Sequence, residues 1–309
     1  MAAPRTFVVL GTGHWAEHCH GRALADHPDV ELAGFWGRDH GRAQAVASRV
    51  GGRGFATVEE ALEAADAVAI ALPPHVQAPL AARAARAGRH LLVDKPLALD
   101  LRAADDVVAA TRESGVASVV YMTYLFQPDI TSWLARMSAL ADQQGPWEGA
   151  LARWGGTIDV PGSPYAASAW RREWGGLWDC GPHALSIVLS LLPPVERVTA
   201  ARGVRDAVNV ALEHRGGAGS ALSLTLTAPE GAGGSFASVW GPAGRHDLPR
   251  FSGTPQEGFA RAVDQLRGAA EEGRPHPLDA AYARDVVAVL AAAQLHLDRP
   301  AAERSTPVG

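Results

Sequence analysis

The stretch Thr6–Ala16, TFVVLGTGHWA, decides the fold of the first part of this chain. Residues 6–10 form a short run of apolar, β-branched and aromatic side chains, which predicts a buried strand. Gly11-Thr12-Gly13 follows at once, and residues 14–26 then read as a helix. Glycines between a strand and a helix let a pyrophosphate approach the backbone at the positive end of the helix dipole. The pattern Gly11-x-Gly13-x-x-Ala16 therefore predicts a dinucleotide-binding loop.

Strands and helices continue to alternate up to about residue 122. The further expected strands are short and mostly apolar, and they cover residues 30–36, 54–56, 67–72, 90–93 and 117–122. The expected helices between them cover residues 39–50, 57–64, 76–87 and 100–114. Thr57 with Glu60 fits a capping box at the start of one of these helices. This alternation predicts an α/β domain with a doubly wound parallel sheet.

The pattern changes near residue 121. A helix is expected over residues 129–141, and strand-like runs follow at 149–154, 196–202, 207–213, 220–227 and 235–240. Because turn signals separate these runs at hairpin spacing, we expect a largely antiparallel, open sheet in an α+β domain. Two helices, over residues 256–272 and 278–297, close the chain. The sequence therefore predicts a first domain over residues 1–121 and a second over residues 122–309.

The end of the second strand is where an NAD enzyme usually carries an acidic residue for the ribose. Gly37 and Arg38 stand there in this sequence, and Asp39 follows. Glycine leaves space for a 2′-phosphate and arginine can donate two hydrogen bonds to it, which favours NADP. The alternative is that Arg38 is a solvated surface charge and that Asp39 binds the ribose of NAD.

A second informative stretch is Trp170–Leu192, WRREWGGLWDCGPHALSIVLSLL. Pro182 suits a first helical turn, and the run is apolar from residue 184 onward, so a helix is expected. Asp179 and His183 are four residues apart, and residues at that spacing share one face of a helix. The pair is therefore a candidate acid–base pair at the mouth of a helix. The alternative is a helix N-terminus whose histidine is merely satisfied by hydrogen bonds.

Two other groups of side chains could be reactive. Four metal-ligating side chains follow the glycine loop: His14, His18, Cys19 and His20. A helix N-terminus repels a cation and the usual zinc ligand spacings are not met, so we expect no metal site. Cys180 and His183 could form a thiol–imidazole pair for acyl transfer. No other feature supports that alternative, and a small buried cysteine is the commoner case.

Composition limits the classes of partner. The chain has 309 residues, a formal net charge of −5 and no basic block, so we expect no nucleic-acid partner. Its two cysteines make no disulfide framework, and the first apolar run is too short for a signal peptide, so a cytoplasmic location is expected. No apolar stretch reaches the roughly 18 residues of a membrane span.

Five motifs follow one another along the chain: Gly11-x-Gly13-x-x-Ala16, Pro73-Pro74, Asp94-Lys95-Pro96, Trp170-Arg171 and Asp179-x-Gly181-x-His183. In these motifs and their order, the chain resembles the Gfo/Idh/MocA (glucose-fructose oxidoreductase, inositol dehydrogenase, rhizopine catabolism) family. The resemblance implies a Rossmann domain followed by a domain whose open sheet often forms homodimers or tetramers. It also implies NAD(P)-dependent hydride transfer at a carbinol or carbonyl carbon of a sugar, an inositol or a related small molecule.

The resemblance implies roles for single positions. Lys95 would lie near the nicotinamide and the reacting oxygen, His183 would exchange the proton, and Asp179 would orient His183 or the substrate. The positions implied to contact the cofactor are Gly11, Thr12, Gly13, His14, Trp15, Gly37, Arg38, Leu72, Pro73, His75, Asp94, Lys95 and Arg171.

Some positions depart from the family pattern. Asp94 replaces the commoner Glu, Pro74 a frequent Asn and Leu125 a frequent Arg, and Ser186 stands where an Asp often follows the histidine. The loss of polar groups implies a substrate less polar than a free sugar. Two other activities fit the resemblance, namely a hydrolase that retains its nicotinamide and a regulator that senses NAD(P) without catalysis.

Overall fold

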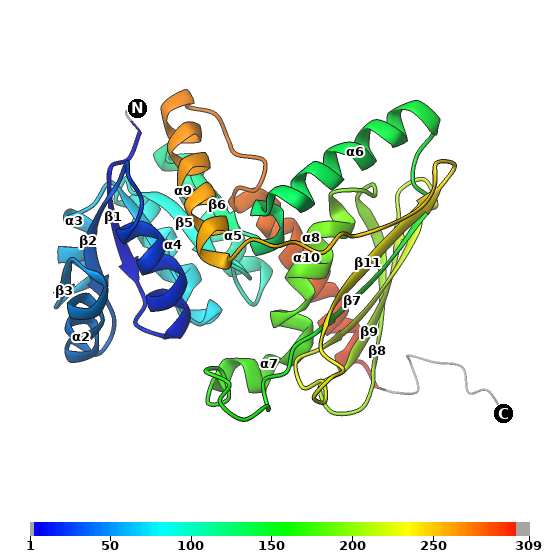
Figure 1. Ribbon diagram of the computed structural model, residues 1–309, viewed down its shortest axis with the longest axis horizontal. Helices are drawn as coiled ribbons and strands as arrows, with labels where there is room; N and C mark the ends of the chain where they lie inside the picture. The colour runs from blue at the N-terminus through cyan, green and yellow to red at the C-terminus, as the bar shows by residue number, and fades with distance from the viewer. Residues whose placement is uncertain (1–2, 301–309) are drawn as a thin grey trace. The chain divides into compact units, whose positions relative to one another are not determined.

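The computed structural model describes residues 3–300, and contacts divide the chain into two compact units (Figure 1). The first unit joins the chain up to Gln127 with Ser252–Val287, and the second joins Pro128–Phe251 with the chain from Ala288 onward. α9 (Pro255–Glu272) thus lies in the first unit, and the division passes within α10 (Ala280–Asp298). The two domains expected on either side of residue 121 remain a prediction.

The first unit is built on a six-stranded sheet in which every pairing is parallel, in the order β3-β2-β1-β4-β5-β6. The strands are β1 (Thr6–Leu10), β2 (Glu31–Trp36), β3 (Arg53–Phe55), β4 (Ala67–Ile70), β5 (His90–Asp94) and β6 (Ser118–Tyr121). β4 and β6 are buried along their whole length, as expected of strands covered on both faces. The predicted doubly wound parallel sheet is confirmed.

Helices connect these strands, and their starts follow from local capping. They are η1 (Ala16–Gly21), α1 (Arg22–Ala25), α2 (His40–Val50), α3 (Val58–Glu63), α4 (Pro74–Arg86), α5 (Leu101–Ser114) and η2 (Thr123–Phe126). Thr57 caps α3 by accepting the Glu60 N–H, but the Glu60 carboxylate accepts from Ala56 and not from the cap residue. The helix expected over residues 14–26 is π-helical in its middle, at η1.

The second unit is built on a six-stranded sheet in the order β12-β11-β7-β10-β9-β8. Its strands are β7 (Gly149–Gly155), β8 (Val195–Arg202), β9 (Val208–His214), β10 (Gly219–Thr225), β11 (Gly234–Gly241) and β12 (Gly244–Asp247). All pairings are antiparallel except the one between β7 and β10, so the prediction of a largely antiparallel sheet is confirmed. The short strand β12 had no counterpart among the expected elements.

Three helices of the second unit precede or interrupt its sheet in the chain: α6 (Pro128–Gln144), α7 (Ala169–Asp179) and α8 (Gly181–Leu189). β9 alternates strictly between buried and exposed residues, so the sheet has one packed face and one exposed face. Within residues 3–300, no helix combines the length and the apolar character needed to cross a bilayer.

His20 occupies an unusual place in the core of the first unit. Its side chain is fully buried in η1, where the ring stacks on Phe259 of α9 at 4.0 Å between centroids. Within the described part of the chain, neither ring nitrogen has a hydrogen-bond partner. Burial lowers the pKa of His20 to about 3, because the charged ring would lose its contact with water. His20 is therefore a neutral ring that the fold tolerates at a cost.

We expect His20→Phe to stabilise the protein. At pH 7 the change removes two unpartnered buried polar atoms, each of which destabilises the folded protein by about 1–3 kcal/mol. Below the unfolded pKa of about 6.5 the unfolded chain binds a proton that the folded chain does not, so wild-type stability falls by about 1.4 kcal/mol per pH unit towards pH 3. The variant should escape that part of the acid sensitivity in urea unfolding at pH 7.5 and pH 5.

The matched control is His214→Phe. His214 is also buried, but its ring nitrogens lie 2.6 Å from the Pro193 carbonyl and 2.8 Å from the Ser220 hydroxyl. Its replacement should therefore destabilise the protein. A His20→Phe protein that is less stable than wild type at both pH values would contradict the interpretation.

Candidate functional site

The loops that carry most of the predicted cofactor positions leave one edge of the first sheet. Leu10 pairs with Trp36 and with Ile70, and Ile70 pairs with Val93, so the carboxyl ends of β1, β2, β4 and β5 lie in a row. From these ends depart the segments 11–15, 37–38, 72–75 and 94–95. Open α/β sheets bind ligands at this edge, where the strand order reverses beside β1. Arg171 alone among these predicted positions belongs to the second unit.

The glycines at this edge of the sheet are explained by different structural requirements. Gly11 has φ +142°, and a Cβ there would lie 2.5 Å from the carbonyl oxygen of Ala71. A Cβ on Gly37 would lie 2.7 Å from the Cγ2 of Thr12. Both glycines are therefore required by packing of the chain on itself. Gly13 is exposed, and apart from Gly13 itself and its two chain neighbours no heavy atom of the described residues lies within 4 Å of its Cβ position, so packing of the chain on itself does not explain its small size.

The two charged residues after β2, Arg38 and Asp39, differ in whether they make hydrogen bonds. Asp39 caps α2, and its Oδ1 accepts the Arg42 N–H at 3.0 Å. Arg38 is exposed and makes no hydrogen bond or ion pair within residues 3–300. The residue type that suits a phosphate is thus the one available at this corner.

Lys95 is the single lysine of the sequence, because all other members of its 28 Lys and Arg residues are arginines. It lies half-buried directly after β5. Arginine stays protonated in proteins, whereas the lysine amine is a compact charge whose pKa can shift. A chain that uses arginine everywhere else keeps lysine at the edge where a ligand is expected, which favours a chemical role over a merely solvated charge.

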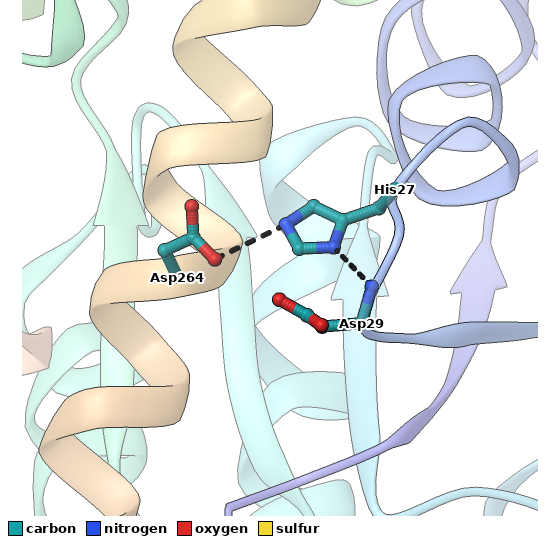
Figure 2. Close-up of side chains that lie close together, drawn as sticks. All are labelled: His27, Asp29 and Asp264. Atoms are coloured by element: carbon teal, nitrogen blue, oxygen red, sulfur yellow. Dashed lines mark hydrogen bonds and ion pairs between the residues drawn. The ribbon is translucent and has the colours of Figure 1, made fainter.

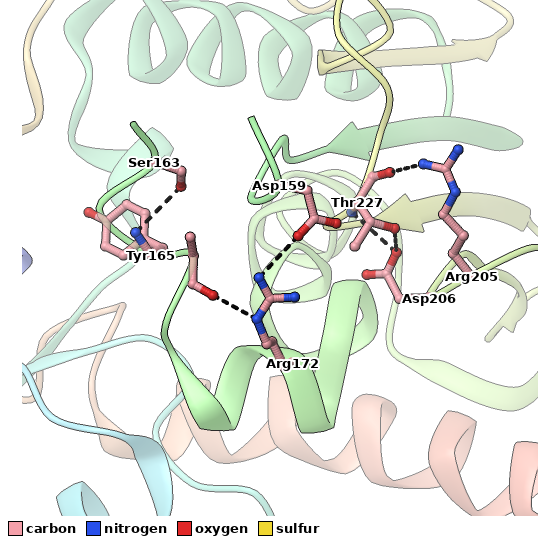
Figure 3. Close-up of polar contacts among 8 residues, drawn as sticks. Asp159, Ser163, Tyr165, Arg172, Arg205, Asp206 and Thr227 are labelled. Carbon is pink, nitrogen blue, oxygen red and sulfur yellow. Dashed lines mark hydrogen bonds and ion pairs between the residues drawn. The ribbon is translucent and has the colours of Figure 1, made fainter. Parts of the chain in front are cut away.

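In the second unit, the turn that carries Asp179 is held on the sheet by Asp206. Figure 3 shows Asp206 beside Thr227 and Arg205. The carboxylate accepts hydrogen bonds from four residues: Gly176, Thr225, Leu226 and Thr227. Burial acts to raise the pKa of Asp206, but these hydrogen bonds outweigh it and leave the pKa below its usual value. The end of β10 and the second half of α7 are thereby joined through one carboxylate.

Gly175 and Gly176 explain the shape of α7. Gly175 has φ +58° and interrupts the helix, and a Cβ on Gly176 would lie 2.6 Å from the Cα of Thr225. The Cys180 thiol donates to the Thr225 carbonyl at 3.2 Å, so it too serves the contact with β10. The glycine pair therefore allows the chain to dock on its own sheet. The same interruption hid α7 from the sequence pattern, which predicted only the helix that follows it.

Asp179 ends α7, and Arg171 is its partner. The Nε of Arg171 lies 3.2 Å from Oδ2 of Asp179, and the two side chains are only 17% and 13% exposed. The guanidinium also lies over the rings of Tyr165, at 4.4 Å, and Trp170, at 4.6 Å. Removing Arg171 would leave a nearly buried carboxylate without this partner, which is costly. Arg171 thus orients the predicted catalytic carboxylate, whatever else it contacts.

His183 lies in the first turn of α8 and is partly exposed. Cys180 joins the two helices, with its carbonyl accepting the N–H groups of both His183 and Ala184. Ser186, at the position where an Asp is frequent, is fully buried and donates to the His183 carbonyl at 2.8 Å. The predicted pair therefore stands on either side of a tight helix junction, with Asp179 on α7 and His183 on α8.

A group of metal-ligand residue types that no sequence motif indicated lies elsewhere in the first unit. Figure 2 shows His27 between Asp29 and Asp264. His27 Nδ1 accepts the Asp29 N–H at 3.2 Å, so a neutral ring carries its proton on Nε2, which faces Asp264 at 3.2 Å. Arg267 also lies within 4 Å of both carboxylates. The group is an ion-pair contact between α9 and the loop before β2, and nothing in it indicates a cation.

Comparison with known proteins extends this picture. A family model described as "Oxidoreductase family, NAD-binding Rossmann fold" (GFO_IDH_MocA) matches residues 5–122. The chain is 29% identical over 297 residues to dTDP-3,4-didehydro-2,6-dideoxy-alpha-D-glucose 3-reductase of Streptomyces antibioticus, a match that covers 92% of this chain and 87% of the relative. It is 33% identical to UDP-N-acetylglucosamine 3-dehydrogenase of Acidithiobacillus ferrooxidans over 105 residues, which are 34% of this chain and 33% of the relative.

A solved structure has the same fold over nearly the whole chain. It is GenD2 from gentamicin A biosynthesis in complex with NAD, with a TM-score of 0.81 and 23% sequence identity. The likeness covers 96% of this chain and 95% of that one, so both units take part in it. None of these three proteins is described as a hydrolase or as a regulator.

Substitutions at Gly11 and Gly13 should have different effects, the first on stability and the second on cofactor binding. Gly11→Ala should destabilise the protein by several kcal/mol, because of the clash with Ala71 and the strained φ. Gly13→Leu should leave the unfolding temperature close to that of wild type but weaken NADH and NADPH binding by about tenfold or more, because the side chain fills the space above the loop. Calorimetric titration and thermal unfolding of both variants measure this. Undiminished binding in Gly13→Leu would contradict the assignment.

Proposed function

We propose that the chain is an oxidoreductase of the Gfo/Idh/MocA family, whose model matches residues 5–122, and that it transfers a hydride between a nicotinamide dinucleotide and a carbinol or carbonyl carbon of a sugar. The observation that carries the proposal is the edge of the first sheet, where the open Gly13 loop follows β1 and the single lysine follows β5, the two strands that flank β4. The two relatives reported above are named for nucleotide-linked sugars. A nucleotide-linked or otherwise substituted sugar is therefore the substrate class we propose.

The proposed roles use three side chains. When bound, the nicotinamide supplies the hydride chemistry. Lys95 stabilises the charge that develops on the substrate oxygen, as a positioned ammonium can in a site shielded from water. His183 takes the hydroxyl proton during oxidation and returns it during reduction, a contribution of about 10²–10⁴ in rate. Asp179, held by Arg171, orients His183 or a neighbouring substrate hydroxyl.

The proposal is tested with a panel of dTDP- and UDP-hexoses, their keto forms, free sugars and inositols, assayed with both cofactors at the nicotinamide absorbance. On the substrate found, His183→Ala and Lys95→Met should each lower kcat by about 10² or more. NADH affinity of His183→Ala should stay within a modest factor of wild type, because the histidine acts on the substrate. Near-normal turnover in His183→Ala, or hydrolysis without net change of the cofactor, would reject the proposal.

We further propose that NADP is preferred over NAD. The support is the corner after β2, where Arg38 is available and Asp39 is used as a helix cap. Arg38→Ala should weaken NADP binding by about tenfold and NAD binding little, because only NADP carries the 2′-phosphate. Titration of both cofactors against Arg38→Ala and the control Arg42→Ala decides this. Tighter wild-type binding of NAD, or equal losses for both cofactors, would count against the preference.

The exposed face of the second sheet supports a homo-oligomer. Leu151 of β7 pairs with Ala221 of β10, which pairs with Ala211 of β9, and all three are exposed. Leu151, Phe236 and Trp240 are 43%, 37% and 41% exposed. Adjacent apolar side chains on a sheet are a typical association surface. Light scattering of wild type against Leu151→Arg measures the mass, and a monomeric wild type would contradict this part of the proposal.

A further inference from the structure

The backbone on both sides of Lys95 is held by one buried side chain that the sequence motifs do not include. Gln77 lies on α4 and is fully buried. Its Nε2 donates to the Asp94 carbonyl at 2.7 Å and to the Pro96 carbonyl at 3.0 Å. These two carbonyls belong to the residues immediately before and after Lys95. One amide group therefore fixes both ends of the three-residue segment that carries the lysine.

The oxygen of the same Gln77 amide shows that these hydrogen bonds are made at a loss of stability. The Gln77 Oε1 is buried and has no hydrogen-bond partner within residues 3–300. A buried acceptor without a partner destabilises a protein, and an apolar side chain of equal length would avoid that loss. It would, however, remove the Gln77 hydrogen bonds to both carbonyls. The glutamine is thus explained by its two N–H groups, and these are aimed at the segment around Lys95.

The position of Gln77 in the chain gives this contact a second effect. α4 begins at Pro74, within the segment 72–75 that follows β4, and Gln77 is in its first turn. β4 and β5 are neighbours in the sheet. The hydrogen bonds of Gln77 therefore couple the loop after β4 to the loop after β5, and these are two of the loops at the proposed nicotinamide edge.

We propose that Gln77 is a positioning residue for Lys95, and that it acts through the carbonyls of Asp94 and Pro96 without touching substrate or cofactor. The inference rests on the proposed function for the part that concerns turnover. Its structural part, the placement of the Lys95 amine, stands without it. Rigid placement matters because a shift of about 1 Å in a reacting group can cost up to about 10² in rate.

Because Lys95 is the single lysine, amine-specific acetylation reports on it directly. The rate of acetylation by acetic anhydride, followed by peptide mass spectrometry, gives the accessibility of the amine, and its pH dependence gives the pKa. In Gln77→Met and in Gln77→Glu, which keeps the shape but lacks the two N–H donors, the rate should rise about threefold or more, because the segment gains local freedom. Gln77→Asn is a smaller variant for the case that the larger changes prevent folding.

The matched control is Gln127→Met. Gln127 is equally buried in the first unit and its Nε2 also donates to a backbone carbonyl, that of Thr254 at 3.2 Å. Its loss should lower the unfolding temperature and leave Lys95 acetylation unchanged. An unchanged Lys95 rate in all folded Gln77 variants would overturn the inference. The same conclusion would follow if Gln127→Met changed the rate as much as the Gln77 variants do.

A double-mutant cycle separates positioning from general damage. Gln77→Met should lower kcat about tenfold in the wild-type background and have no effect on kcat in the Lys95→Met background, because residues acting as a unit are not additive. Equal losses in both backgrounds would overturn the positioning role. If Lys95→Met alone leaves turnover normal, the proposed function of Lys95 fails, while the acetylation result still decides whether Gln77 places the amine.

Discussion

The close contact between the glycine loop and the end of β4 is the constraint on which the first unit depends. At Gly11 the backbone lies so near the Ala71 carbonyl that no side chain fits, and the Gly11 N–H also binds the Trp36 carbonyl at 2.8 Å. Three strand ends are thereby joined at one residue. Everything proposed for the cofactor depends on this junction, because it sets the edge from which each loop departs. The space at Gly13 is open because the close contact with the end of β4 is made two residues earlier, at Gly11.

In the second unit, the carboxylate of Asp206 holds the turn that carries Asp179. An isolated turn between two helices would not hold Asp179 in one place, since backbone groups at helix ends lack intrahelical partners. Asp206 accepts hydrogen bonds from the Gly176 N–H and from three residues at the end of β10. The turn is therefore part of the sheet's hydrogen-bond network. Arg171 then fixes the Asp179 carboxylate from the side. The predicted acid–base pair is thus supported on rigid elements and not on a loop.

The sequence predicted those features that repeat or that depend on local chemistry. Alternating apolar runs gave the parallel sheet, and the Thr57 cap gave the start of α3. It did not predict α7, because Gly175-Gly176 interrupts the pattern and the reason for both glycines lies in contacts with Asp206 and Thr225, distant in the chain. Gln77 was missed for a similar reason. A lone glutamine on an expected helix carries no signal until its partners, two backbone carbonyls near residue 95, are known.

The choice between lysine and arginine connects the fold to the chemistry. Arginine is the cation of ion pairs such as those of Arg49 with Glu17 and of Arg171 with Asp179. Those pairs need a planar donor that is always charged. Lys95 is the single lysine of the sequence, and its flanking carbonyls are held by a buried side chain whose own oxygen has no hydrogen-bond partner within residues 3–300. A residue type kept against the composition of the chain, on a segment held at a loss of stability, is best explained by a requirement for one amine in one place. On the proposed function, that requirement comes from the reaction and not from folding.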